Sequence, residues 1–365
     1  MRNAHACALY TICEYYIPML TAIIVIIFLS LLIVAHELGH FLLSKKFGLF
    51  VGEFGLGLPP RAWGKKIGET IYSINWLPFG GYVKIAGENG GEDEQDGVPA
   101  NLPKERIFYN IAAWKRALIL AGGVGMNFLF GWIILSGIFM VGVPQEVFVG
   151  QIQKDSPAAS AGIKESDKVL GYKTAADFSG AMKAHGGEQI TVHLERAGKE
   201  VDVQLTPRKN PPTGQGPIGV SLMETGQPKE GFVMSLWDGL KASFDIVWAT
   251  VEGIGHLLKQ TIIGKGSLDG VSGPIGIVKI TSQASSIGFI YVLQLLALIS
   301  LNLAAFNILP FPALDGGRLL FLAIEKIKGS PLPKKFEQYA NGIGMALLLL
   351  LILVISIKDI IRIVH

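Results

Sequence analysis

Long uncharged apolar runs alternate with polar stretches along the chain. The first two runs span Tyr15–Ala35 and Ala117–Gln145 without a charged residue. The third lies within the uncharged stretch Ile280–Leu314 and is most apolar near Ile287–Leu309, and the fourth spans about Gln338–Ile357. Because a bilayer core of about 30 Å is crossed by about 20 helical residues, the pattern predicts four transmembrane helices.

The first apolar run has the position of a secretory signal peptide. No small-residue cleavage site follows it, and His36, Glu37 and His40 follow instead. We therefore expect a retained transmembrane helix. Met19 directly precedes the hydrophobic core, so residues 1–18 are either an N-terminal extension or the product of an overcalled start.

Composition agrees with a membrane protein and excludes a disordered chain. Hydrophobic residues make up 50% of the 365 residues, and the mean hydropathy is +0.43. Charged residues make up 17%, against about 25% in an average soluble protein. The net charge of +3 is too small to indicate nucleic-acid binding. The two cysteines, Cys7 and Cys13, are too few for a disulfide framework or a cysteine zinc cluster.

Lysine and arginine near the ends of the runs predict the orientation of the helices. The basic residues that fall on one side of a four-helix arrangement are Lys45, Lys46, Lys115, Arg116, Arg318, Lys326, Lys328, Lys334 and Lys335. That side should be the cytoplasm, so both termini and the segment between the second and third helices are expected to face outward. Lys358 and Arg362 are weak evidence against this orientation.

The first part of the outward segment has the pattern of a small β-rich module. Strands are expected at Phe148–Ile152, Asp167–Leu170, Ile190–Arg196 and Val201–Leu205, with a turn and short helix at Ser156–Ile163. The S-P-A-x-x-A-G-I stretch, the Asp-Lys-Val that follows it and the last hairpin resemble a PDZ domain over roughly Val147–Pro207. Such domains bind extended peptides by strand addition, and a β-rich spacer that binds nothing is the alternative.

Two further segments carry regular patterns. Phe232–Lys259 has apolar residues at alternating spacings of four and three, which predicts an amphipathic helix at the membrane interface or against another helix. Thr70–Trp76 and Gly80–Ile85 have the composition of strands and are expected to form a hairpin through a turn at Pro78. The hairpin is either structural or offers an edge strand to an extended peptide. The acidic run Glu88–Asp96 is typical of a solvated loop.

The stretch His36-Glu-Leu-Gly-His40 carries the chemistry. On a helix, two histidines four positions apart project from the same face, so both imidazoles can reach one Zn²⁺ at about 2.0–2.1 Å. Glu37 is then placed to act as general base on a water molecule. A carboxylate at the middle of a transmembrane helix costs about 2.5–3.5 kcal/mol. We therefore expect these residues to face the protein interior as a metal site.

A third protein ligand is expected because catalytic zinc usually has three. No third histidine follows His40 at the spacing of other zinc proteases, and the best candidate is Asp315 in Leu314–Gly317, directly after the third apolar run. Pro310 and Pro312 break regular structure there. The two glycines that follow Asp315 permit a close approach of the backbone to the metal or to another helix.

H-E-L-G-H in the first run and L-D-G-G after the third resemble the site-2 protease family of intramembrane zinc metalloproteases. The further segments that carry the resemblance are Phe79–Lys84, Trp114–Arg116, Gly122, Gly123, Asn127, Ser272–Ile277, Asn302 and Asn307. Val124 stands where the family commonly has proline. With its PDZ-like module the chain is similar to the bacterial regulator-of-sigma-E protease branch. That branch often carries two such modules, and the single module here leaves substrate gating open.

The resemblance implies roles for the site residues. His36, His40 and Asp315 would hold one zinc ion per chain, and Glu37 would activate water. The substrate would be a single-span membrane protein such as an anti-sigma factor or a signal-peptide remnant, and the PDZ-like module would filter it by size or dock it. The residues that would bind the substrate in extended form are Gly81, Tyr82, Asn302 and Asn307.

The fold class expected is a polytopic α-helical membrane protein with about four transmembrane helices, a membrane-associated β-hairpin region and an inserted extracytoplasmic PDZ-like β-rich domain. It would lie in the bacterial cytoplasmic (inner) membrane with the active site toward the cytoplasm. The expected segments are an N-terminal extension (1–18), the first transmembrane helix (19–46), a cytoplasmic-side hairpin region (47–113), the second transmembrane helix (114–145), the PDZ-like domain (146–225), an amphipathic helix and loop (226–279), the third transmembrane helix with L-D-G-G (280–317), a cytoplasmic loop (318–337) and the fourth transmembrane helix (338–365).

Two other functions compete with an intramembrane protease. A membrane zinc transporter or metal sensor would not need Glu37 beside the ligands, nor a peptide-binding module. A catalytically silent scaffold that uses only its PDZ-like region is disfavoured by the complete H-E-x-x-H with an aspartate.

Overall fold

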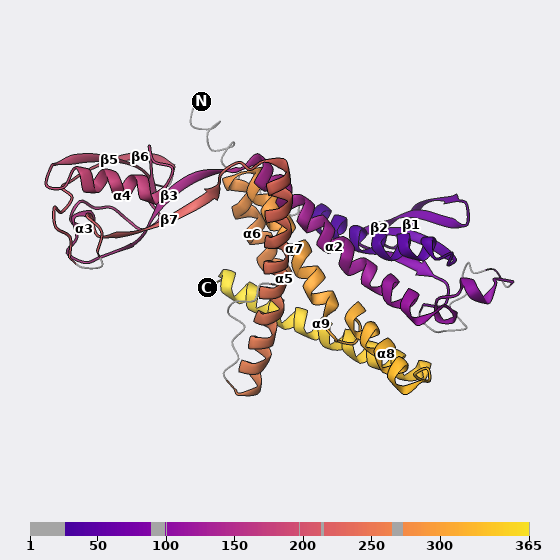
Figure 1. Ribbon diagram of the computed structural model, residues 1–365. Coiled ribbons are helices and arrows are strands. Elements are labelled where there is room, and N and C mark those ends of the chain that lie inside the picture. Colours follow the sequence, from indigo (N-terminus) through magenta and orange to yellow (C-terminus); the bar gives the residue numbers. More distant parts are fainter. Residues whose placement is uncertain are drawn as a thin grey trace, which may run out of the picture. The chain divides into compact units, whose positions relative to one another are not determined.

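The computed structural model describes residues 26–88, 99, 101–196, 198–212, 215–264 and 273–364. Cys7, Cys13 and Met19 therefore lie outside the described residues, as does the first part of the first apolar run. The chain divides into two compact units, one formed by Met1–Ser136 with Leu236–His365 and the other by Gly137–Ser235 (Figure 1). We call them the helical unit and the inserted unit.

The helical unit contains the four expected spans. Within the described residues, four helices are long and apolar enough to cross a membrane: the N-terminal helix Ile26–Lys46, α2 (Ala113–Val141), α7 (Phe289–Ile308) and Lys335–Ile361 of α9 (Lys334–Val364). The mean hydropathy of their most apolar windows is 2.0 to 2.5. The prediction of four transmembrane helices is confirmed by the length and composition of these helices.

The third apolar run is divided differently from the prediction. Pro274–Ile287 forms the separate helix α6, Gly288 follows it, and α7 ends at Ile308. Asp315 is the first residue of another helix, α8 (Asp315–Lys328). The boundary 280–317 for the third transmembrane helix was therefore wrong, because Pro310 and Pro312 end the regular structure before the L-D-G-G stretch.

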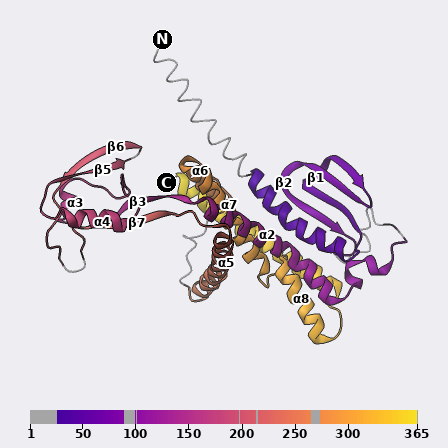
Figure 2. The same cartoon turned by 45° about the horizontal axis from the view of Figure 1, so that its top comes forward.

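Two long strands form the sheet of the helical unit, β1 (Val51–Ile67) and β2 (Thr70–Ile85) (Figure 2). They pair antiparallel, and Glu53 of β1 lies opposite both Lys84 and Ile71 of β2. The first half of β1 therefore lies between the two halves of β2. The two predicted strand segments are confirmed, but the expected hairpin through Pro78 is wrong, because both segments pair with β1 in the described residues.

A buried carboxylate connects the halves of this sheet. Glu53 is 4% exposed, and its Oε1 accepts a hydrogen bond from Ser73 Oγ at 2.7 Å. The same carboxylate forms ion pairs with Arg61 at 2.7 Å and Lys84 at 3.2 Å. One side chain of β1 thus contacts both halves of β2.

The helix α5 (Phe232–Ile262) confirms the predicted amphipathic helix. From Leu236 onward it packs on α2 and α7. Trp132 Nε1 of α2 donates to the Leu236 carbonyl at 2.9 Å, and Thr250 Oγ1 donates to Asn302 Oδ1 of α7 at 2.7 Å. These contacts show that α5 packs against other helices, whereas Val233, Trp237 and Phe244 of the predicted apolar stripe are exposed, as a role at the membrane interface requires.

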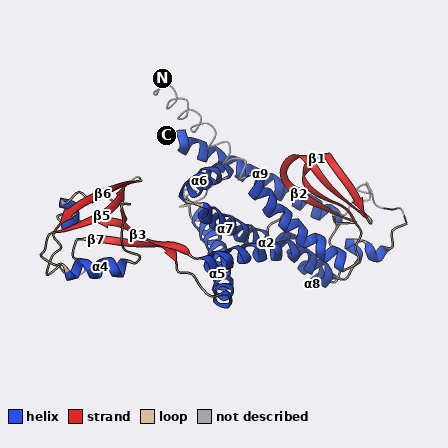
Figure 3. Ribbon diagram, turned by 90° about the horizontal axis from the view of Figure 1, so that it is seen from above, coloured by secondary structure: helices blue, strands red, loops and turns tan. Residues whose placement is uncertain are grey.

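The inserted unit is a small mixed α and β structure (Figure 3). Its described elements are β3 (Val143–Ile152), α3 (Pro157–Ser160), β4 (Lys168–Val169), α4 (Ala175–Ala184), β5 (Ile190–Arg196), β6 (Lys199–Leu205) and β7 (Val220–Gln227). The described strands form one sheet in the order β6-β5-β4-β3-β7, packed around a core that includes Val147, Phe178 and Leu194. The predicted strands and the short helix are confirmed, whereas α4 and β7 were not predicted.

Candidate metal centre

The site forms where the N-terminal helix crosses α2 at glycines. A Cβ atom added to Gly39 would lie 2.1 Å from the Gly122 carbonyl oxygen, and one added to Gly123 would lie 2.4 Å from His40 Nε2. Neither position accepts a side chain without moving a helix. The glycines therefore bring the α2 backbone directly against the two imidazoles.

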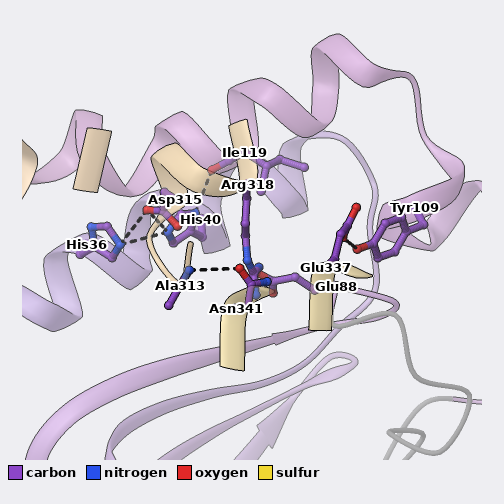
Figure 4. Close-up of polar contacts among 10 residues, drawn as sticks. All are labelled: His36, His40, Glu88, Tyr109, Ile119, Ala313, Asp315, Arg318, Glu337 and Asn341. Atoms are coloured by element: carbon purple, nitrogen blue, oxygen red, sulfur yellow. Dashed lines mark hydrogen bonds and ion pairs between the residues drawn. The ribbon is translucent and has the colours of Figure 1, made fainter. Parts of the chain in front are cut away.

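Three potential ligand atoms lie together at this crossing (Figure 4). His36 Nε2 is 3.1 Å from Asp315 Oδ2, His40 Nε2 is 3.4 Å from the same oxygen, and the two Nε2 atoms are 3.2 Å apart. Ligand atoms placed 2.0–2.1 Å from a tetrahedral zinc ion are separated by about 3.3 Å. The triangle therefore fits three corners of a zinc site, and its donor set of two imidazoles and one carboxylate suits zinc.

Local backbone geometry explains how Asp315 reaches the histidines. Ala313 has φ +75°, and its N–H donates to Asn341 Oδ1 of α9 at 3.0 Å. A Cβ atom added to Gly316 would lie 2.2 Å from the Leu309 carbonyl oxygen, and one at Gly317 would lie 2.2 Å from that of Phe311. The two glycines of L-D-G-G thus let the start of α8 pack on the turn that precedes it.

A polar cavity of about 240 Å³ adjoins the triangle. Its lining residues are His36, Glu37, His40, Val83, Glu88, Asn307, Ala313, Leu314, Asp315 and Arg318. A water molecule takes up about 30 Å³ in the liquid, so the cavity has room for several. Glu37 therefore shares a hydratable space with the three potential ligands.

Of the four predicted substrate-binding residues, two lie at the cavity or beside Glu37 and two do not. Asn307 lines the cavity, and a Cβ atom at Gly81 would lie 3.7 Å from Glu37 Cγ. The Tyr82 ring covers Gly55 of β1. Asn302 accepts the hydrogen bond from Thr250 of α5 and is not among the described residues that line the cavity. Asn307 therefore shares the cavity with Glu37, and Gly81 lies beside Glu37, whereas Tyr82 and Asn302 contact neighbouring elements.

Two charged lining residues, Glu88 and Arg318, were not predicted to belong to the site. Arg318 Nη1 donates to Glu88 Oε1 at 2.5 Å, and the side chains are 30% and 20% exposed. Arg318 lies three positions after Asp315 on α8, a spacing that puts both on one helix face. Glu88 begins the acidic run and lies beyond the end of β2, as a loop residue would, but its carboxylate pairs with Arg318 at the cavity. Residues 89–96 lie outside the described residues.

A histidine pair one helical turn apart, a carboxylate from a second helix and a neighbouring glutamate at a polar cavity define a zinc metalloprotease among membrane-spanning helices. Comparison with known proteins places the chain more narrowly. The model of peptidase family M50 matches residues 24–351, and the chain belongs to this family of site-2 proteases.

Named relatives are similar over nearly their whole length. CPE1693 of Clostridium perfringens, provisionally named a zinc metalloprotease, is 34% identical over 338 residues, covering 91% of this chain and 96% of the relative. The zinc metalloprotease RasP of Geobacillus kaustophilus is 32% identical over 413 residues, covering 92% and 96%. The regulator of sigma-W protease RasP of Bacillus subtilis is 29% identical over 420 residues, covering 94% and 98%. The resemblance to the site-2 proteases and the prediction of a zinc metalloprotease are confirmed.

Proposed function

We propose that this protein hydrolyses a peptide bond within the transmembrane segment of a single-span membrane protein, using one zinc ion per chain. The observation that carries the proposal is the triangle of His36, His40 and Asp315 with Glu37 beside it at a polar cavity. These groups lie on helices that are proposed to span the membrane. Hydrolysis there consumes water, which the apolar layer does not supply, so a polar cavity beside the site is required.

The residues divide the chemistry between them. His36, His40 and Asp315 hold the metal, and Glu37 receives a proton from the attacking water. Zinc, when bound, supplies Lewis-acid activation of water and of the scissile carbonyl. As the C–N bond breaks, Glu37 returns its proton to the leaving amine, so the carboxylate is regenerated at the end of the reaction.

The sheet of β1 and β2 is proposed to hold the substrate extended. A transmembrane helix hides its peptide bonds in its own hydrogen bonds, so the substrate must unwind before cleavage. The β2 segment Gly81–Ile85 pairs with Val51–Leu56 on one side, and its other side has no partner strand in the described residues. An unwound substrate that adds to this edge would pass Glu37, because Gly81 lies beside it.

Polar side chains are proposed to orient that extended segment. The Asn307 carboxamide lines the cavity and is suited to bind a substrate carbonyl or amide. Tyr82 belongs to the same β2 segment, and its ring packs over Gly55 of β1, so it is proposed to stabilise the face of the sheet beside the open edge. Asn302 is proposed to act through packing, because its carboxamide accepts the Thr250 hydroxyl.

Charge supports an active site on the cytoplasmic side of a bacterial membrane. Lys45 and Lys46 end the N-terminal helix, and Lys115 and Arg116 begin α2, so one end of both spans is basic. The inserted unit is then extracytoplasmic. Its strands and its S-P-A-x-x-A-G-I stretch support a PDZ-like module that filters or docks substrates.

The substrate class proposed is an anti-sigma factor or a signal-peptide remnant. The name of the Bacillus subtilis relative, regulator of sigma-W protease, supports the first of these. Each of them presents one transmembrane helix, which an unwinding step must open before Glu37 can act.

Reconstitution tests this function. The full-length protein is placed in vesicles with a panel of single-span substrates of both kinds, and zinc content and cleavage are measured for wild type, Glu37→Gln and Asp315→Ala. We expect Glu37→Gln to retain zinc and lose cleavage, and Asp315→Ala to lose both. A zinc-loaded wild type that cuts none of the substrates, or a Glu37→Gln variant that cuts normally, contradicts the proposal.

A further inference from the structure

Both imidazoles of the site have one nitrogen in the ligand triangle and the other against α2. His40 Nδ1 is 2.8 Å from the Ile119 carbonyl oxygen. A carbonyl oxygen can only accept a hydrogen bond, so Nδ1 carries the proton. The lone pair of His40 is therefore on Nε2, the atom that faces Asp315.

His36 has a corresponding contact with a side chain of α2. Its Nδ1 lies 3.3 Å from Asn127 Nδ2. Asn127 is 1% exposed, and its Oδ1 is buried with no hydrogen-bond partner among the described residues. The oxygen and nitrogen of a carboxamide have nearly the same shape, so the amide fits this position in either orientation.

Only one of these two orientations leaves a lone pair on His36 Nε2 for a metal. If Asn127 Nδ2 donated to His36 Nδ1, the imidazole proton would be on Nε2 and would point at Asp315 and His40. If Oδ1 faces the imidazole, Nδ1–H donates to it, and the Nε2 lone pair is available for a metal. The second orientation also gives the buried Oδ1 the donor that it lacks.

Neighbouring residues of α2 and α7 support the contact between Asn127 and His36. Ile119, Gly123 and Asn127 are spaced by four and form one stripe of α2. A Cβ atom at Gly123 would lie 2.6 Å from His36 Cε1. The absence of a side chain at Gly123 therefore gives the His36 imidazole the room to lie against α2. Ser300 of α7, which is fully buried, donates to the Asn127 backbone carbonyl at 2.8 Å and holds that turn of α2 in place.

We propose that Asn127 is a positioning residue of the metal centre: its carboxamide oxygen accepts the His36 Nδ1–H and so fixes the tautomer and ring orientation that bind zinc. With the Ile119 carbonyl on His40, α2 then orients both histidines although it supplies no ligand. The inference rests on the proposed function, because it gives His36 and His40 the role of zinc ligands.

The test uses the full-length protein in detergent or nanodiscs and does not depend on cleavage. Asn127→Leu keeps the size of the side chain and removes the acceptor, and Asn127→Asp keeps an acceptor oxygen. Ser300→Ala is the matched control, since it removes a contact to the same residue without touching the imidazole. Zinc affinity is measured by competition with a chromophoric chelator, and the unfolding temperature is measured on the zinc-free protein.

We expect Asn127→Leu to weaken zinc binding by about 10- to 100-fold, the usual effect of removing a hydrogen-bond partner of a histidine ligand. Asn127→Asp and Ser300→Ala should bind zinc within a few-fold of wild type. Unchanged zinc affinity in Asn127→Leu overturns the inference. So does an equal loss in Asn127→Leu and Ser300→Ala that follows a lower zinc-free unfolding temperature, because that pattern indicates packing alone. A wild type that binds no zinc refutes the proposed function instead.

Discussion

Arg318 of α8 donates a hydrogen bond to Glu88, and both side chains line the cavity that contains Glu37. Arg318 stands one turn after Asp315, whereas Glu88 lies three residues beyond the end of β2. The pair therefore connects the helix that carries one potential zinc ligand to the sheet proposed to hold the substrate. Charge-assisted hydrogen bonds of this kind contribute about 1.5–3 kcal/mol.

Arg318→Gln is expected to lower kcat/KM about 10- to 100-fold, since loss of the pair frees the end of β2 from α8, and each 1.4 kcal/mol is a factor of ten. Zinc content should stay at the wild-type level, because His36, His40 and Asp315 are all retained in the variant. The exchange variant Arg318→Glu with Glu88→Arg should recover part of the activity. If the exchange variant is no better than Arg318→Gln, the pair itself does not account for the effect.

Gly123→Ala is expected to remove zinc from the protein. The added Cβ atom would lie 2.4 Å from His40 Nε2 and 2.6 Å from His36 Cε1, and both rings would have to move. Metal analysis of the purified variant, with circular dichroism to check folding, measures the effect, and a loss of at least tenfold in zinc affinity is expected.

Gly125→Ala is the matched control for this prediction. It lies on the same helix, and a Cβ atom there meets nothing within 4 Å. The control should retain zinc and folding, and alanine is the better helix former of the two residues. Equal zinc loss in Gly123→Ala and Gly125→Ala would show that helix α2 as a whole, rather than the glycine contact, is responsible.

Much of the site could be predicted from the sequence because its signals are local. His36 and His40 share one helix face at a spacing of four, and Asp315 follows an apolar run at a break marked by prolines. Arg318 and Glu88 could not be predicted together, because 230 residues separate them and only the folded chain makes them neighbours.

The fold could be predicted where hydrophobic periodicity is strong and was missed where it is weak. The four apolar helices follow from length and composition alone. The strand β1 carries glycines at 52, 55, 57 and 64 and two prolines, which are signals for turns, so Val51–Ile67 was not predicted as a strand. Its insertion between the halves of β2 is a tertiary arrangement that the local pattern does not contain.

Asp167 is expected to stabilise the inserted unit in a pH-dependent way. Burial alone would raise the pKa of Asp167, but hydrogen bonds from Arg196 and from the Lys164 amide lower it below its usual value. The carboxylate therefore stabilises the folded unit above the unfolded-state pKa of about 4. That stability is lost as the pH falls through the lower pKa of the folded state.

Hydrogen–deuterium exchange over β4 and β5 of the full-length protein measures this contribution. Asp167→Ala should speed exchange there at pH 7, by an amount that corresponds to about 1 kcal/mol, since the Lys164 amide and the partly exposed Arg196 lose their acceptor. Asp202→Ala, at an exposed pair with His193, is the control and should change little. Equal exchange in wild type and Asp167→Ala would contradict the assignment.

Gly81→Val is expected to reduce cleavage and leave zinc binding unchanged. A Cβ atom at this position would lie 3.1 Å from the Gly55 carbonyl oxygen and 3.7 Å from Glu37 Cγ, so a branched side chain would fill the space between the open edge of β2 and the general base. An extended substrate could not then approach Glu37 along that edge. The expected loss in kcat/KM is at least about tenfold, or 1.4 kcal/mol, measured on a reconstituted single-span substrate beside a zinc assay.

Gly52→Ala separates this effect from general damage to the sheet. Gly52 lies on the inner strand β1, and the nearest atom to its added Cβ would be Phe50 Cε1 at 3.5 Å, an ordinary contact. Gly52→Ala should cut at close to the wild-type rate. Normal cleavage by Gly81→Val would mean that the substrate reaches Glu37 by a route other than the edge of β2, and zinc loss in that variant would mean that Gly81 supports the metal centre instead.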